Sequence, residues 1–546
     1  MSPDANPVGA LRALRSARQR KRLVRLEWFE LAYKVYVAAL AVLGAVVLIS
    51  NIVGDNPLTD SETADVFRLG PPAVGVALAA AVLMGLRSGA RGGPLSVEAA
   101  DVQYVMLAPI DRRAVMMRPA VQQYRLAAFA GASLGGISGQ LLGRRLERAL
   151  IPWATMGALV GATIGVAFVA SAFAAHLTRA RRWQAALLGL GLLGWQVAAV
   201  PTDWDVPGPF DTLGSLALWP DRIHAHDLAL PVAVALVALA TLLGLRRISI
   251  DALARRTALV RQLRFAVTMR DLRTVILLRR QLSNEQLRVR PWFRLPRRLG
   301  TAVTRRGLHS AARLPAARVL RMCALSAIAG AAQVAAFRGT TPAVFVSALA
   351  AFVLGLECLE PFAQEVDQPD RCDSLPQARG WLLLRHLMVP AITSVLFGLV
   401  GAGTAMAIAR NEVGWQLSLL LLLPVVWSGL GGAVLNVMAA LPAPELPGSV
   451  NDMLPPEVAG TREVLRTIRP LLVAVAGSLP VLAGRAAWRS GDQPLPPALQ
   501  AVVAVALVLA AVVWWARRRD EVRAKARNLW AAGGAEFDAR RSQQSR

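Results

Sequence analysis

Apolar stretches of membrane-spanning length recur along this 546-residue chain, and no other feature limits its possible folds as strongly. Within a bilayer every backbone polar group must be hydrogen-bonded by the protein itself, so about 20 consecutive apolar residues cross as an α-helix. Hydrophobic residues make up 55% of the chain and charged residues 18%, which argues against both a soluble enzyme and a disordered chain. Twelve stretches qualify: 35–53, 70–86, 126–142, 151–176, 184–200, 228–245, 320–337, 342–358, 386–408, 415–438, 470–486 and 498–515.

The sequence therefore predicts an all-α polytopic membrane protein with about 12 transmembrane helices in two six-helix halves. The longest segment between apolar stretches separates six of them from the other six, and it contains about nineteen arginines against three acidic residues. Five parts follow: a cytoplasmic amphipathic basic helix at 1–34, a first six-span half at 35–245, a basic cytoplasmic linker at 246–318, a second six-span half at 319–516 and a cytoplasmic basic tail at 517–546.

The distribution of arginine predicts the orientation of the chain, because loops rich in Lys and Arg remain in the cytoplasm. The segments 54–69 and 201–227 are acidic and are expected outside, whereas 87–125 and the tail are basic and are expected inside. Both termini are therefore expected in the cytoplasm, with the protein in the inner membrane. The basic segment 144–148 contradicts this topology: either the third and fourth stretches form a re-entrant hairpin, or this loop is an exception.

Arginine-rich loops on the cytoplasmic side of the membrane also explain the net charge of +26. We therefore expect contact with membrane lipids and no binding of nucleic acid. The middle segment is basic and amphipathic, which is typical of a helix lying on an anionic membrane surface. An RNA site would need aromatic side chains interleaved with the arginines, and this segment has no such set.

Residues suited to catalysis are scarce. The pair His224 and His226 lacks the i, i+4 spacing of a helical zinc site, and the three cysteines have no metal-ligand spacing. No GxxxxGK[ST] loop for nucleotide phosphates is present, and none of the three lysines follows a glycine. We therefore expect no enzyme activity, catalytic residue, metal or cofactor in this chain. Charges within the stretches are few, and Glu357 and Arg485 are expected at helix ends, where long side chains reach the interface.

Glycines recur at every fourth position in two neighbouring stretches, which places them on one helix face. Small residues let membrane helices approach closely enough for van der Waals contact to hold them together. Static packing is the favoured interpretation, and a helix pair that slides during gating is the alternative. The predicted packing residues are Gly131, Gly135, Gly139, Gly157, Gly161 and Gly165.

A charged motif follows the second apolar stretch, and a similar one follows the eighth, 267 residues later. The first is Leu107-Ala108-Pro109-Ile110-Asp111-Arg112-Arg113 with Arg118 after it, and the second is Ser374-Leu375-Pro376-Gln377-Ala378-Arg379-Gly380 with Arg385 after it. The equivalent placement favours a parallel duplication. Apolar Met116, Met117, Leu382 and Leu383 beside these charges suit a surface on which another protein docks, and a solvated interfacial helix is the alternative.

On these residues the chain resembles the permease of an ABC-2-type exporter, with two half-permeases fused in one chain. The matching segments are Gly93-Pro94-Leu95-Ser96, Ala100-Asp101-Val102 and the motif ending in Arg112-Arg113, whereas the second motif departs from the pattern with Arg379-Gly380.

The resemblance implies that a separate ABC ATPase subunit binds ATP and docks on short cytoplasmic coupling helices. An amphipathic or lipid-like substrate would then leave outward. Alternatives are a membrane-embedded lipid-handling or assembly protein without transport, and an ion-coupled carrier. The residues that would meet the ATPase are Asp101, Pro109, Asp111, Arg112, Arg113, Arg118, Asp370, Pro376, Arg379 and Arg385.

Overall fold

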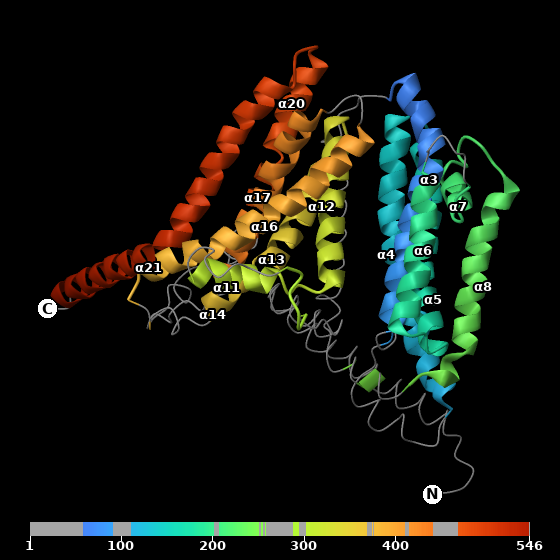
Figure 1. Ribbon diagram of the computed structural model, residues 1–546, viewed down its shortest axis with the longest axis horizontal. Helices are drawn as coiled ribbons and strands as arrows, with labels where there is room; N and C mark the ends of the chain where they lie inside the picture. The colour runs from blue at the N-terminus through green and yellow to red at the C-terminus, as the bar shows by residue number, and fades with distance from the viewer. Residues whose placement is uncertain are drawn as a thin grey trace, which may run out of the picture. The chain divides into compact units, whose positions relative to one another are not determined.

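In the computed structural model, the described part of the chain forms helices joined by turns and loops, and it contains no strand (Figure 1). By its internal contacts the chain divides into two compact units, Met1–Glu285 (unit 1) and Gln286–Arg546 (unit 2). The boundary falls within the arginine-rich segment 246–318. The described residues are 58–90, 95, 111–200, 207–249, 253–254, 257, 288–293, 302–367, 374, 376–409, 414–439 and 468–544.

Eight helices in this described part are long and apolar enough to cross a membrane, and two bent helix pairs raise the number to ten if each pair is one span. The predicted all-helical fold is therefore confirmed in the described residues, with helices long and apolar enough for a multi-pass membrane protein, whereas twelve spans in two halves stay a prediction. The expected fifth span is a helix of 17 residues, at the lower limit for crossing a bilayer. The expected basic helix at 1–34, the first stretch at 35–53 and most of the linker lie outside the described residues.

Unit 1 is organised around α5, which packs against α3, α4 and α8. Helix α3 also packs against α6 and the short helix α7. Its start is fixed by a capping box, in which Thr59 Oγ1 accepts from the Glu62 N–H and the Glu62 carboxylate accepts from the Thr59 N–H. The elements are α3 (Asp60–Gly89), α4 (Arg112–Arg145), α5 (Leu150–Leu177), α6 (Arg182–Ala198), α7 (Asp211–Ala217), η2 (Ala225–Leu228), α8 (Ala229–Leu243) and η3 (Leu245–Arg247).

Helices α4 and α5 meet backbone to backbone along their glycines. A Cβ atom on Gly131 would lie 2.1 Å from the Gly161 carbonyl oxygen, and one on Gly135 would lie 2.1 Å from that of Gly157. The structure also places Gly139 against the Trp153 carbonyl and Gly165 against the Ala127 carbonyl. All six glycines singled out in the sequence therefore lie in one interface, where any side chain would force the helices apart.

The basic connection between α4 and α5 lies at the same end of unit 1 as the acidic segment before α8. The Leu58 N–H donates to the Arg145 carbonyl, and Arg148 forms an ion pair of 3.7 Å with Asp221. At the opposite end Asp111 pairs with Arg246, and a Cβ on Gly244 would lie 3.0 Å from the Leu177 side chain. The helices thus alternate in direction, and α4 and α5 are full-length helices rather than a short re-entrant pair.

Unit 2 is organised around α17, which packs against α13, α16 and α21, while α12 packs against α13 and α16. Ile468–Ala476 and α20 meet at a 42° bend. The C-terminal helix extends well beyond membrane length, so the expected tail at 517–546 is helical up to Gln544 (red in Figure 1). The elements are α11 (Ala302–Ala311), α12 (Ala316–Phe337), α13 (Ala343–Cys358), α14 (Glu360–Asp367), α16 (Arg379–Ile408), α17 (Trp415–Ala439), α20 (Leu479–Arg489) and α21 (Leu495–Gln544).

Buried polar side chains join three segments inside unit 2. The Gln333 amide on α12 donates to the Ser347 hydroxyl on α13 at 2.8 Å and to the Ser478 hydroxyl at 2.9 Å. Ser478 lies at the bend before α20, and all three side chains are fully buried. In an apolar interior a polar group without a partner is costly, so these bonds favour one arrangement of the three segments.

Neighbouring glycines on α4 allow a matched test of the helix contact. Gly135→Ala should lower the unfolding temperature in detergent, because overpacking of this kind costs about 1–3 kcal/mol. Gly136→Ala should leave it unchanged or raise it, because that Cβ meets nothing closer than 3.5 Å and alanine favours helix. Equal melting temperatures for the two variants would contradict the backbone contact.

Candidate partner-docking site

In unit 1 the charged motif ends at the start of α4, where Asp111 caps the helix. Its carboxylate accepts from the Arg113 N–H and from the Arg246 guanidinium, each at 3.2 Å. These two interactions, that of Arg246 first, hold the pKa of Asp111 below its ordinary value. Asp111 thus ties the motif to η3, where the basic middle segment begins. Asp101 and Pro109 lie outside the described residues.

Arg112 and Arg118 are exposed on the first turns of α4, and Arg113 is half-buried. The expectation that Met116 belongs to the same surface is wrong, because its side chain is fully buried in the core of unit 1. Four residues after Arg112, Met116 is already inside the helix bundle. Among the described residues, the exposed charged side chains at the tip of the helix are Asp111, Arg112 and Arg118.

In unit 2 the second motif ends at the start of α16, which begins at Arg379, 267 residues after the start of α4. Pro376 is exposed, Arg379 is half-buried, and Asp370 lies outside the described residues. Arg385 stacks over the Trp381 ring at 3.5 Å. Leu382 and Leu383 are buried rather than on the docking surface, which corrects the second apolar expectation.

Gly380 explains why the second motif has Arg-Gly where the first has Arg-Arg. A Cβ on Gly380 would lie 2.0 Å from the Arg517 carbonyl oxygen on α21. The start of α16 therefore touches the backbone of the C-terminal helix, and no side chain fits between them. This contact places the second motif beside Arg517 of α21, at one end of unit 2.

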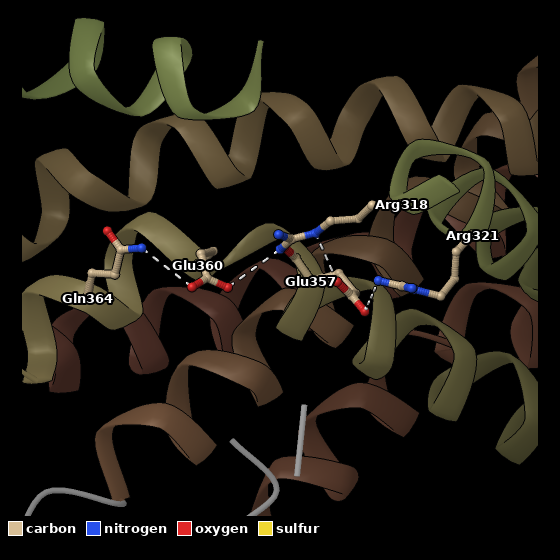
Figure 2. A network of polar contacts seen from close by, with 5 residues as sticks. All are labelled: Arg318, Arg321, Glu357, Glu360 and Gln364. Carbon is tan, nitrogen blue, oxygen red and sulfur yellow. Dashed lines mark hydrogen bonds and ion pairs between the residues drawn. The ribbon is translucent and has the colours of Figure 1, made fainter. Parts of the chain in front are cut away.

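A cluster of buried charges lies at this same end of unit 2, and Figure 2 shows how its side chains converge. The Glu357 side chain is 2% exposed, and its carboxylate forms ion pairs with Arg318 through one oxygen at 3.0 Å and with Arg321 through the other at 2.9 Å. Arg318 also donates to the Glu357 carbonyl and lies 3.6 Å from Glu360. Helix α12 is thereby joined to the corner between α13 and α14. We call Arg318, Arg321, Glu357 and Glu360 the corner cluster.

The corner is a 64° bend between α13 and α14, after which α14 packs against α16. On α14, the buried Glu365 forms an ion pair of 2.7 Å with Arg306 of α11. Helix α11 in turn packs on α16, since a Cβ on Gly307 would lie 2.9 Å from the Val389 side chain. A chain of contacts thus runs from α11, whose Arg306 is half exposed, through α14 to the apolar helices α12 and α13.

Sequence reasoning missed the corner cluster. It placed Glu357 at a helix end within reach of the interface, whereas the bend after Cys358 turns the chain and leaves this carboxylate inside. One signal was available: Glu357 is the first acidic residue after Glu285, in a stretch that contains many arginines. A carboxylate within an apolar stretch calls for a cationic partner, and Arg318 and Arg321 precede the adjacent stretch.

Arg485 also departs from expectation, because it is buried rather than extended to the interface. Its guanidinium donates to the Thr341 hydroxyl at 2.7 Å and to the Ala336 carbonyl at 3.4 Å. Ala336 is in the last turn of α12, where the helix dipole favours a cation. This arginine therefore secures the end of unit 2 opposite to the corner cluster.

His224 and His226 come together in unit 1, with ring centroids 5.4 Å apart. Over the described residues no group of three His, Cys, Asp or Glu side chains is arranged to hold a metal ion. The His226 ring lies 3.4 Å from the buried Asp227, which also accepts from the Trp219 indole. The two histidines therefore belong to a polar segment directly before α8 in unit 1.

The corner cluster offers a test in which each carboxylate is the control for the other. Glu357→Gln should lower the free energy of unfolding by about 3–5 kcal/mol, because it removes the buried carboxylate that pairs with Arg321 and that is the nearest counter-charge of the buried Arg318. Glu360→Gln should cost less than about 1 kcal/mol, since that carboxylate is partly exposed and 3.6 Å from Arg318. Denaturant unfolding in detergent measures both, and comparable losses would contradict the central role of Glu357.

Two glycines of α16 test the contact with α21. Gly380→Ala should separate the helices at this end and raise the rate at which trypsin cleaves after Arg517–Arg519. Gly403→Ala on the same helix should not, because a Cβ there meets nothing within 4 Å. Limited proteolysis followed by mass spectrometry measures the difference, and equal cleavage rates would show that the close approach is absent.

No family model, curated protein or solved structure matches this chain. A proposal of function therefore depends on the residues and contacts described above.

Proposed function

We propose that this protein is the membrane-spanning permease of an ATP-driven exporter, and that a separate ATPase subunit moves it from the cytoplasmic side. The observation that carries the proposal is the corner cluster. Together with the ion pair between Arg306 and Glu365, it joins the surface helix α11, through α14, to the apolar helices α12 and α13, and so supplies a path along which a push on the surface reaches the spans.

The two motif ends fit the role of docking points. Each comes just before a membrane-spanning helix, with an exposed stretch and an arginine at the helix start: Asp111 and Arg112 on α4, and Pro376 to Arg379 on α16. In each unit a close contact links the motif to another element, Asp111 to η3 and Gly380 to α21. A partner that binds at the starts of α4 and α16 would therefore move these helices as well as the loops before them.

An ion-coupled carrier is the less favoured alternative. Such a protein needs ionisable groups in its spans that can take up and release an ion. Glu357 is a buried carboxylate in this position, but arginine occupies both of its oxygens. It serves as a tie between helices and has no oxygen left over for a transported ion.

Purification of the full-length protein from its native membranes in mild detergent tests the proposal directly. We expect an ATPase with a nucleotide-binding loop to co-purify, and ATP hydrolysis by the complex to drive substrate accumulation in inside-out vesicles. Accumulation that follows an imposed ion gradient without ATP would instead establish the carrier. A preparation that is fully active with no ATPase present would also overturn the proposal.

Arginine variants test the docking points. Arg112→Ala and Arg379→Ala should each raise the concentration of partner ATPase needed for half-maximal stimulation of ATP hydrolysis by roughly ten-fold, which corresponds to about 1.4 kcal/mol of lost interface energy. The control is Arg338→Ala, an exposed arginine at the opposite end of unit 2. All three should melt at the wild-type temperature, and unchanged stimulation in the first two would contradict docking at the motifs.

A further inference from the structure

The segment Arg288–Phe293 folds onto the connection between α11 and α12. The Arg288 N–H donates to the Arg313 carbonyl and the Trp292 N–H to the Ala312 carbonyl, at 3.0 and 2.9 Å. The Trp292 indole N–H donates to the Leu314 carbonyl at 2.8 Å. The Arg288 guanidinium stacks over the Trp292 ring at 3.7 Å. We call Arg288–Phe293 the clip.

These hydrogen bonds fix the level of the clip relative to the membrane. Their acceptors, Ala312 to Leu314, immediately precede α12, which begins at Ala316 and is long and apolar enough to span. Where such a helix enters the bilayer, the residues just before it lie in the headgroup region. The clip is therefore held at the boundary between lipid and water.

The exposed side chains of the clip are of two kinds. Val289, Trp292 and Phe293 are apolar and are 91%, 49% and 55% exposed. Arg288, Arg290 and the adjacent Arg313 are exposed cations. From Gln286 to Arg318 the sequence contains nine arginines and no acidic residue, so the net charge of this region is strongly positive.

We propose that the clip binds the headgroups of anionic phospholipids and inserts Val289 and Phe293 between the acyl chains. Aromatic side chains favour the membrane interface, and arginines there attract acidic lipids by about 1 kcal/mol each, which is roughly five-fold in affinity per arginine. The clip anchors the start of α12 to acidic lipid beside the corner cluster. This inference needs α12 to span the membrane and does not depend on the nature of the transport reaction.

A lipid fits this surface better than a nucleic acid or a protein. Nucleotide bases would need a set of open aromatic faces on which to stack, but Arg288 covers one face of Trp292 and the indole N–H is bonded to Leu314, so Phe293 is the fully open ring of the clip and forms no such set by itself. A protein would need to cover both the cations and the apolar tips of a segment that is held in the headgroup region. An anionic lipid supplies a phosphate for the arginines and hydrocarbon for the apolar tips at once.

Spin labels on the full-length protein test the insertion. On a background without the three native cysteines, Val289→Cys and Phe293→Cys would carry the labels, and Gln377→Cys, an exposed site nine residues before the apolar stretch at 386–408, would be the control. In nanodiscs with about one third phosphatidylglycerol, labels at 289 and 293 should be accessible to oxygen and shielded from a water-soluble nickel reagent, with the reverse at 377. Labels at 289 and 293 that meet the nickel reagent freely, or that neither reagent reaches because protein covers them, would overturn the proposal.

Paired arginine variants test the headgroup contact. Arg290→Gln with Arg313→Gln should release bound phosphatidylglycerol, lowering its retention in native mass spectrometry by roughly five-fold per arginine. Arg338→Gln with Arg489→Gln removes the same charge from exposed positions at the other end of unit 2 and should leave retention at the wild-type value. Equal loss in the two pairs would mean that net charge alone, and not the clip, holds the lipid.

Discussion

Close approach of helix backbones is the interaction on which both units depend. Lipid is as apolar as leucine, so burial of hydrophobic side chains does not by itself hold membrane helices together, and contact at short range must do so. Unit 1 achieves it with the six glycines between α4 and α5. Unit 2 uses pairs: Gly330 against Gly401 joins α12 to α16, and Gly355 against Gly429 joins α13 to α17. Glycine thus sets where helices cross, and the larger side chains fill what remains.

Buried charges select one arrangement of the packed helices in unit 2. The corner cluster and Arg485 lie at opposite ends of unit 2, and each places arginine against groups from more than one segment of chain. Buried ion pairs gain little net stability over apolar packing, but they exclude arrangements in which the charges are separated. The apolar helices of unit 2 are therefore held together at both ends by charged side chains, while the hydrogen bonds of Gln333 join them in the interior.

The sequence predicted those features whose spacing is local. Glycines four residues apart share a helix face whatever surrounds them, so the α4–α5 interface could be foreseen from Gly131 to Gly165. Features that depend on a change of chain direction could not be foreseen: the 64° bend decides that Glu357 lies inside, and the close approach of α21 decides that position 380 is glycine. The basic loop between α4 and α5 conflicted with the predicted topology for a related reason. Arg148 forms an ion pair with Asp221, which is distant in sequence, and the arrangement of arginines along the chain does not reveal this contact.

The length of α21 has a geometrical consequence for how motion in unit 2 becomes visible outside it. The helix runs without interruption from Leu495 to Gln544, and its contact with Gly380 at Arg517 lies near the middle. The residues beyond Arg519 extend for about 37 Å at 1.5 Å per residue, so a tilt of about 5° at this fulcrum displaces the far tip by about 3 Å. A small change in the tilt of α21 among the packed helices would therefore produce a larger displacement at the far end of this helix.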